Sequence, residues 1–330
     1  MDREKWLKIL NKYSIFVILL CLFVAFSILS PYFLQPSNLI KVAHQLCVGI
    51  LLAYGEMLLI ISGFLDLSVG SVLALAGVLS VATFKATGSL PLAFIVAISV
   101  SIACNAINAF FVAELNVPAF IATLGMQQAA RGLVLYYTHG ANILQIGDYR
   151  LIGQAEIEGI PIPVIIVVIV TIIMWYLTRH TRYGRGIYAI GGSRPAAEAS
   201  GIDAKKNIFM SYMFNGVLVA LAGMIFMARN NAGLANGAVG YEMTGLTAAI
   251  VGGTSFTGGI GTVTGTVIGA FIIGFLENFM NLQGVDSFIQ QIIEGAIIVI
   301  AVAFDIASKS GKSKKVILVN KNKTKTKKGE

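Results

Sequence analysis

The sequence predicts an all-α polytopic membrane protein with about ten transmembrane helices. Of its 330 residues, 56% are hydrophobic and only 12% are charged, about half the charged share of a soluble domain. The mean hydropathy is +0.81. Apolar runs approaching the roughly 20 residues that cross a bilayer recur along almost the whole chain. A β-barrel would show short alternating segments instead of these unbroken runs.

Ten apolar segments are candidate spans, and we expect some of them to be broken helices. The first is interpreted as a retained helix, because "SILSPYF" offers no small-residue cleavage site. Segment 244–257 is short and contains Gly252 and Gly253, so we expect a broken crossing there. It is kept as a crossing because its loss would violate the charge pattern described next. The ten segments are 13–30, 39–61, 67–86, 90–113, 119–137, 161–178, 207–228, 244–257, 260–282 and 287–305.

The basic residues place three hydrophilic segments on one face of the membrane. Ten spans put both termini on the same side, and most lysines and arginines fall in segments 1–12, 179–206 and 306–330. Cytoplasmic segments carry such an excess, so this face is predicted to be cytoplasmic. Residues 1–12 are then an N-terminal tail and 13–305 the transmembrane domain. The basic tail 306–330 is predicted to be disordered and to lie against anionic lipid. The net charge of +8 thus indicates topology, and no nucleic-acid partner is expected.

The sequence shows no pattern for catalysis, metal binding or a bound cofactor. Neither its three cysteines nor its three histidines have ligand or disulfide spacing. The stretch "SGKS" at 310–313 is no Walker A motif, because Ile306 stands where that motif needs glycine. We therefore expect no catalytic residue, no cofactor and no metal on this chain. Any energy source must be an ion gradient or a separate protein.

The segment "GFLDLSVG" (63–70) places an aspartate inside one of the most apolar parts of the chain. From the residues alone Asp66 could cap a helix, relay an ion or contact a solute. Capping is favoured, because a relay needs several carboxylates and only Glu56 is near in sequence. We expect Gly63 to break one helix, and Asp66 and Ser68 to satisfy the first amides of the next, including that of Val69. Gly70 should allow close packing.

A weak internal repeat relates this segment to a later one. "EMLLIISGFLDLSVGSVLALAG" (56–77) and "EMTGLTAAIVGGTSFTGGIGTVTGTVIG" (242–269) both run from Glu-Met through an apolar stretch to a glycine break. Transporters often contain such duplications, although chance similarity between apolar segments remains an alternative. In the second segment Gly261, Gly265 and Gly269 form a GxxxGxxxG ridge, which predicts a tightly packed helix.

The longest hydrophilic interruption spans residues 178–207. Its part "YGRGIYAIGG" is interpreted as a compact turn, and "SRPAAEASG" as a short helix. In that helix Ser193 is the expected cap, Pro195 an early position and Gly201 the stop. A short helix held off the bilayer is typical of a docking element for a soluble partner, with an ordinary ordered loop as the alternative.

Four motifs together resemble the membrane permease subunit of sugar-type ABC importers, especially the ribose permease branch. The resemblance covers residues 32–305. The motifs are "SGFLDLSVGS" (62–71), "FIATLGMQQAARGLVLYYTHG" (120–140), "TRYGRGIYAIGGSRPAAEASGI" (181–202) and "GYEMTGLTAAIVGGTSFTGGIGTVTGTVIGAFIIGFLENFMNLQGV" (240–285).

The resemblance implies a homodimer in a bacterial cell membrane, with a translocation pathway between two permease copies. It also implies two partners: an ATPase subunit with two fused nucleotide-binding domains, which uses ATP and Mg, and an extracytoplasmic sugar-binding protein. The residues implied for coupling to the ATPase are Arg182, Gly184, Ser193, Pro195, Glu198 and Gly201. Those implied for the pathway or the helix breaks are Gly63, Asp66, Ser68, Gly70, Phe120, Thr123, Arg131, Glu242, Gly252 and Gly253.

Some positions depart from the family pattern, among them Phe64, Leu65, Thr244 and Ile260. They leave the class in place and leave the solute open: ribose, another pentose, a hexose or a related small polar solute. A related permease for nucleosides or branched-chain amino acids is one alternative function. The alternative from another class is an ion-driven secondary transporter, which the few membrane carboxylates and the docking-type loop disfavour.

Overall fold

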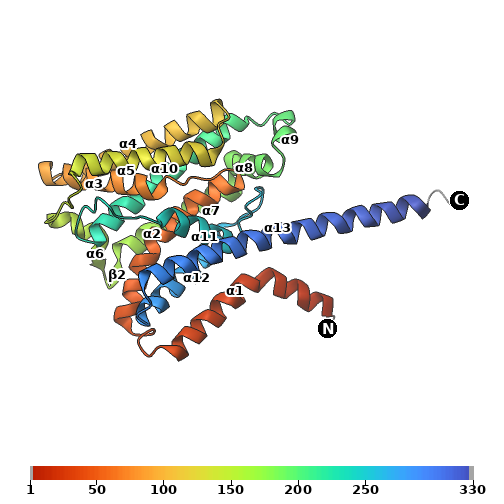
Figure 1. The fold of residues 1–330 in the computed structure, drawn as a ribbon, viewed down its shortest axis with the longest axis horizontal. Coiled ribbons are helices and arrows are strands. Elements are labelled where there is room, and N and C mark those ends of the chain that lie inside the picture. Colours follow the sequence, from red (N-terminus) through yellow and green to blue (C-terminus); the bar gives the residue numbers. More distant parts are fainter. Residues whose placement is uncertain (1–2, 327–330) are drawn as a thin grey trace.

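The computed structural model of the chain describes the backbone of residues 3–326 and the side chains of residues 15–307. These residues are helical almost throughout, and most helices run side by side along the long axis of the molecule (Figure 1). The predicted fold class, an all-α polytopic membrane protein, is confirmed.

Thirteen α-helices, two short helical turns and a small hairpin follow one another along the described chain. Their bounds are α1 (Arg3–Leu29), α2 (Pro36–Ile61), α3 (Val69–Thr87), α4 (Leu90–Ala109), the π-helical turn η1 (Phe110–Glu114), α5 (Ala119–Thr138), the 3₁₀ turn η2 (Gly147–Arg150), α6 (Leu151–Gln154), β1 (Glu156–Ile157), β2 (Ile160–Pro161), α7 (Ile162–His180), α8 (Arg182–Gly192), α9 (Arg194–Ala199), α10 (Ala204–Arg229), α11 (Tyr241–Val251), α12 (Val263–Leu282) and α13 (Ser287–Thr326).

Seven described helices are long and apolar enough to cross a membrane, judged by length and composition. They are α2, α3, α4 with η1, α7, α10, α12 and the first half of α13. The apolar part of α1, Ile15–Leu29, is shorter. Helix α5 has 20 residues but carries Gln127, Gln128 and Arg131. Each of the ten predicted segments therefore contains a helix, and the three outside this set of seven are α1, α5 and α11.

Helix α11 is too short to span a bilayer by itself. At about 1.5 Å of rise per residue, its 11 residues cover about half of a roughly 30 Å hydrocarbon core. Non-helical backbone at residues 230–240 and 252–262 precedes and follows it. In the predicted span 244–257 a short helix thus stands between two irregular segments, and a broken crossing there stays a prediction.

The centre of the fold is helix α2, which is buried along most of its length from Val42 to Ile61. Helices α10, α11, α12 and α7 pack around it, and α10 also packs on α3 and α4. Small residues allow these close approaches. A side chain at Gly223 of α10 would overlap the Leu73 carbonyl oxygen of α3, and Gly252 lies directly against Gly265 of α12. The predicted ridge on α12 therefore packs tightly, and its partner is α11.

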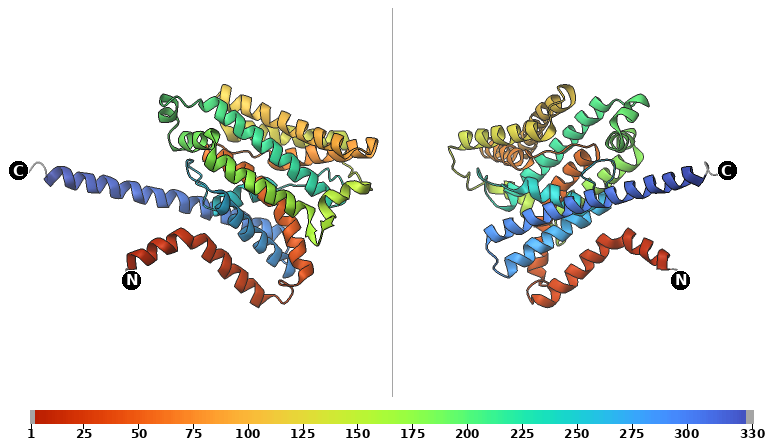
Figure 2. Two further views of the ribbon diagram at one scale, coloured as in Figure 1. Left: turned by 180° about the vertical axis from the view of Figure 1, so that it is seen from behind. Right: turned by 45° about the vertical axis from the view of Figure 1, so that its right-hand side comes forward.

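The start of α1, the far end of α13 and helices α8 and α9 all lie toward one end of the molecule, at the right in Figure 1. Helix α6 and the β1–β2 hairpin lie toward the opposite end. Both views in Figure 2 show α13 reaching well past the packed helices. It continues as a helix to Thr326, through residues for which the sequence predicts a disordered tail. Lysine is a good helix former, and no proline interrupts this stretch.

Candidate functional site

The first helix break lies between α2 and α3 and is built around Asp66. Helix α2 ends at a left-handed glycine, Gly63 with φ of 88°, and the amide of Phe64 donates to the carbonyl of Leu59 at 2.9 Å. This pattern is a Schellman motif, in which glycine at positive φ avoids the steric cost of a Cβ atom. Gly63 thus terminates α2 and starts the turn that leads to α3.

Asp66 is fully buried, and Ser68 of the turn before α3 and side chains from two helices converge on it. Its Oδ1 accepts the amide of Ser68 at 2.8 Å and also the Ser68 hydroxyl. Its Oδ2 accepts the amide nitrogen of Asn215 from α10 at 2.8 Å, while Asn108 from α4 donates to both Asp66 and Ser68. Such a network offsets the cost of burying a carboxylate at membrane depth.

The hydrogen bonds of Ser68 and Asp66 differ from the predicted cap in two details. The hydroxyl of Ser68 donates to Asp66 and does not cap α3 itself. Asp66 accepts the amide of Ser68, and among the described contacts no hydrogen bond to it comes from Val69. Glu56 is also fully buried, and its Oε2 accepts the Asp66 amide at 3.4 Å. Asp66 therefore fixes the turn before α3 and ties it to α4 and α10.

The second break, between α11 and α12, repeats the geometry of the first. Helix α11 ends at Gly253, which also has a φ of 88°. The amide of Thr254 donates to the carbonyl of Ala249 at 3.0 Å, as Phe64 does to Leu59. The weak internal repeat in the sequence thus corresponds to two helices that end in the same way.

The two breaks lie against each other. The amide of Gly259 in the second break donates to the carbonyl of Ile61 at the end of α2, at 2.9 Å. Helix α8 closes this junction, because a Cβ atom at Gly191 would overlap both the Ile61 oxygen and the Gly259 nitrogen. The hydroxyl of Tyr188 in α8 also donates to the carbonyl of Gly261 at 2.8 Å.

A third cluster joins α3, α5 and the start of α11. Gly70 lies directly against the carboxylate of Glu242, whose Oε1 accepts a hydrogen bond from Gln127 at 3.0 Å. Arg131 donates to the carbonyl oxygens of Ala235 and Gly237 at 3.1 and 2.9 Å. Non-helical backbone in a membrane must be satisfied by other protein groups, and Arg131 does this for two carbonyls of segment 230–240. The structure therefore brings Gly70, Arg131 and Glu242 together.

The two other predicted pathway residues on α5 are not part of this cluster. The hydroxyl of Thr123 is buried and donates to the carbonyl of Ala119 in the preceding turn at 2.8 Å. Phe120 is half exposed on the surface of the helix. Neither side chain lines the pocket beneath α13 that is described below.

The segment predicted to couple to a partner forms two helices, α8 and α9, at one end of the bundle. The interpretation of "YGRGIYAIGG" as a turn is wrong, because it is the 11-residue helix α8. Thr181 caps this helix through the amide of Gly184 at 3.0 Å. A Cβ atom at Gly184 would overlap the carbonyl oxygen of Thr178, so glycine allows the sharp turn from α7. The side chain of Arg182 is exposed.

Helix α9 has six residues and follows the predicted plan with one exception. Pro195 stands in the first turn, and Gly201, with φ of 80°, ends the helix. Ser193 occupies the capping position, but its side chain accepts no capping hydrogen bond. Glu198 is exposed and pairs with Arg194 at 2.9 Å. Because an exposed pair of this kind contributes little stability, these charges remain available to a partner.

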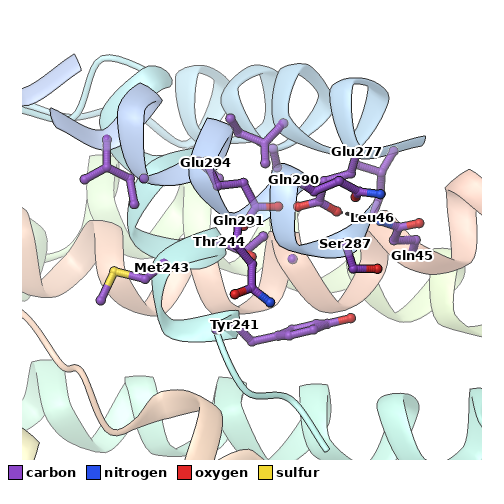
Figure 3. Close-up of a pocket in the computed structure, with 18 of the residues that line it drawn as sticks. Gln45, Leu46, Tyr241, Met243, Thr244, Glu277, Ser287, Gln290, Gln291 and Glu294 are labelled. Carbon is purple, nitrogen blue, oxygen red and sulfur yellow. Dashed lines mark hydrogen bonds between the residues drawn. The ribbon is translucent and has the colours of Figure 1, made fainter. Parts of the chain in front are cut away.

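The first turns of α13 cover a pocket of about 440 Å³ beside α2, α11 and α12, which is lined by both apolar and polar side chains (Figure 3). Gln45 donates to Glu277 at 2.6 Å, and Glu294 of α13 lines the same pocket. Figure 3 shows Ser287, Gln290, Gln291 and Glu294 over this space, with Tyr241 on the opposite side. No pattern in the sequence pointed to it, because its residues come from four separate segments.

Comparison with known proteins identifies the class of this membrane bundle. Residues 38–302 match the family model described as "Branched-chain amino acid transport system / permease component". The chain belongs to this permease family. No solved structure matches it.

Several curated permeases are similar to this chain over almost their whole length. The ribose import permease protein RbsC of Escherichia coli K12 is 38% identical over 294 residues, which are 88% of this chain and 92% of that protein. RbsC of Bacillus subtilis 168 is 38% identical over 301 residues, 90% and 93% of the two chains. The D-allose transport system permease protein AlsC of Escherichia coli K12 is 38% identical over 299 residues, 89% and 91%. The matched residues 38–302 of this permease include the two helix breaks, helices α8 and α9, and the residues that line the α13 pocket.

Proposed function

We propose that this chain is the membrane-spanning subunit of a binding-protein-dependent ABC importer that carries a monosaccharide into a bacterial cell. The similarity to permeases named for ribose, allose and arabinose supports the monosaccharide, at 38, 38 and 31% identity. In this proposal ATP and Mg are used by a separate ATPase subunit. An extracytoplasmic binding protein delivers the sugar, and the chain itself carries no catalytic residue and binds no cofactor.

The observation that carries this proposal is the position of α8. It packs into the junction where the breaks at Ile61 and Gly259 meet, and it is followed by the exposed helix α9 with its Arg194–Glu198 pair. A partner that binds α9 would therefore move an element in direct contact with both breaks. ATP-driven closure of the ATPase would favour one of two packings of the bundle, and sugar release would follow from the switch.

The proposed orientation places both termini and α8–α9 in the cytoplasm. These three elements lie toward one end of the molecule (Figure 1), and the segments around them carry most of the basic residues. The opposite end, with α6 and the β1–β2 hairpin, would then face the binding protein. Protease protection of epitopes inserted at either end would test this orientation.

We further propose that the working unit is a homodimer with the pathway between the two copies. Gly125, Gln128 and Gly132 are exposed on α5 at helical spacing, and added Cβ atoms at both glycines would meet open space. A glutamine facing lipid is costly, whereas small residues favour helix pairing. Rapid cross-linking of Gly132→Cys in membranes supports this interface, and a monomer by light scattering contradicts it.

Uptake into membrane vesicles tests the function directly. The importer proposal predicts sugar uptake that requires ATP and continues when an ionophore collapses the ion gradients. Uptake that proceeds without ATP and stops with the ionophore would contradict it and indicate a secondary transporter.

A second candidate solute class is supported by the description of the matching family, which names branched-chain amino acids. Thermal-shift screening of the partner binding protein separates the candidates. Stabilisation by ribose, allose or arabinose supports the proposal. Stabilisation only by leucine, isoleucine or valine, or only by nucleosides, would replace the monosaccharide.

A further inference from the structure

The pocket beneath α13 has a mostly apolar lining, but the first turns of α13 add several polar side chains to it. Ser287, Gln291 and Glu294 recur at intervals of three to four residues, which places them on one face of the helix. Figure 3 shows them over the space bounded by Tyr241 and Glu277. Glu294 lies two turns inside the candidate span that begins at Ser287, and a carboxylate at that depth is costly unless it meets water or a partner.

Part of the polar lining is already satisfied by the protein. Gln290 donates to Asn281 and to the carbonyl of Val285, both at 2.9 Å, and Gln45 donates to Glu277. In contrast, no side-chain hydrogen bond joins Ser287, Gln291 or Glu294 to another residue within the described part of the chain. The pocket therefore combines a fixed wall with free donors and acceptors.

The composition of the lining favours an uncharged polyhydroxylated solute. Carboxylates accept hydrogen bonds from hydroxyl groups, and side-chain amides can donate as well as accept. The ring of Tyr241 offers an apolar surface beside them. Two carboxylates and no basic side chain among the described lining residues disfavour an anion. A volume of about 440 Å³ lies in the usual range for small-molecule pockets and would leave a single metal ion mostly uncontacted.

We propose that this pocket binds a monosaccharide within each permease subunit, through Glu277, Glu294, Gln291 and Ser287. The inference rests on the proposed function and adds a site that belongs to the permease and not to its binding protein. The sugar would lie beside the short helix α11, because Tyr241 and Thr244 of that helix form the opposite wall of the pocket.

Protection of an introduced cysteine tests this site on the full-length chain in nanodiscs. In a Cys21→Ser background, Ser287→Cys is treated with a membrane-impermeant thiol reagent, with and without D-ribose, D-allose or L-arabinose. We expect at least one sugar to slow the labelling several-fold, whereas equimolar sodium chloride has no effect. The matched control is Phe288→Cys, because Phe288 is 75% exposed on the neighbouring position of the same helix. Its labelling should not respond to sugar.

A second pair of variants keeps the proposal falsifiable if Ser287→Cys folds poorly. Gln291→Cys should show the same protection, and adding Glu294→Gln should weaken it. Sugar-independent labelling of both pocket cysteines overturns the site, and so does equal protection at Phe288→Cys. If ATP-driven uptake is intact while protection is absent, only the pocket assignment fails. If uptake itself is absent or independent of ATP, the proposed function fails.

Discussion

The backbone amide of Gly259 and the backbone carbonyl of Ile61 are hydrogen-bonded at 2.9 Å, although almost two hundred residues separate them in sequence. This bond joins the ends of two crossings that terminate in the same left-handed glycine geometry. Helix α8 touches both partners through Gly191. The helix breaks and the proposed coupling element therefore form one contiguous structure, and the predictions below test its parts.

The Asp66 network should be required for stability. In Asp66→Asn an NH₂ group replaces one of two oxygens that both accept hydrogen bonds, so a donor must face Asn215 or Ser68. Leaving such a buried donor unsatisfied costs about 1–3 kcal/mol. We expect a lower unfolding temperature in detergent and reduced transport. Asp148→Asn is the control, because Asp148 is exposed in the short 3₁₀ turn η2. Equal melting of wild type and Asp66→Asn would show that the charge is dispensable.

The stop of α9 at Gly201 should matter for coupling more than for folding. Its φ of 80° costs a residue with a Cβ atom about 1–2 kcal/mol. We expect Gly201→Ala to misplace Glu198 and lower ATP-driven uptake several-fold, while ATP hydrolysis and assembly persist. Gly201→Asn should retain most activity, because asparagine tolerates this conformation. Wild-type uptake in Gly201→Ala would remove the coupling role of this turn.

Glu198 can be tested by removing its charge alone. The Arg194–Glu198 pair is exposed, so Glu198→Gln should change the free energy of unfolding by less than about 1 kcal/mol. If the carboxylate contacts the ATPase, ATP-driven uptake should nevertheless fall. The exposed salt bridge of Lys205 with Glu114 supplies the control: Glu114→Gln should leave uptake unchanged. Equal uptake in both variants would contradict a contact at Glu198.

The buried hydroxyl of Tyr183 in α8 should make the stability of the protein depend on pH. Because Ser211 donates to the Asn207 carbonyl, the Tyr183 hydroxyl donates to Ser211, at 2.8 Å. Burial raises the pKa of Tyr183 above its ordinary value, which is about 10. A raised folded-state pKa contributes stability that is present below about pH 10 and is lost as the pH rises further.

Wild type should therefore be more stable than Tyr183→Phe at pH 8, by about 1 kcal/mol. This advantage should shrink above about pH 10. A constant advantage measured by chemical denaturation up to pH 11 would contradict this.

The crossings and the breaks could be predicted from the sequence because their causes are local. Apolar length defines a span, and a glycine beside a polar residue in an apolar run marks the end of a helix, as at Gly63 and Gly253. Asp66 was expected to act as a cap for the same reason. Its ties to Asn108 and Asn215 depend on how three helices cross, which a single sequence does not show.

Helix α8 was interpreted as a turn because glycines have low helix propensity. Its glycines are needed for packing: Gly184 approaches the carbonyls of α7, Gly186 the side chain of Asn207, and Gly191 the junction of the breaks. Tertiary contact thus offsets the local preference. The pocket could not be predicted for a related reason, since Glu277 and Glu294 line one space only when α13 packs on α11.

The most direct test of the account compares Gly191→Ala with Gly192→Ala in proteoliposomes that contain the complete importer. A methyl group at Gly191 would overlap the Ile61 and Gly259 backbone, whereas one at Gly192 meets open space. Overpacking of this kind costs about 1–3 kcal/mol, so both variants are first checked for normal assembly. We predict that Gly191→Ala hydrolyses ATP but imports sugar at least about tenfold more slowly, a loss equivalent to about 1.4 kcal/mol. Gly192→Ala should import normally. Wild-type ATP-driven import by Gly191→Ala would contradict the claim that α8 transmits the motion of the ATPase to the paired breaks.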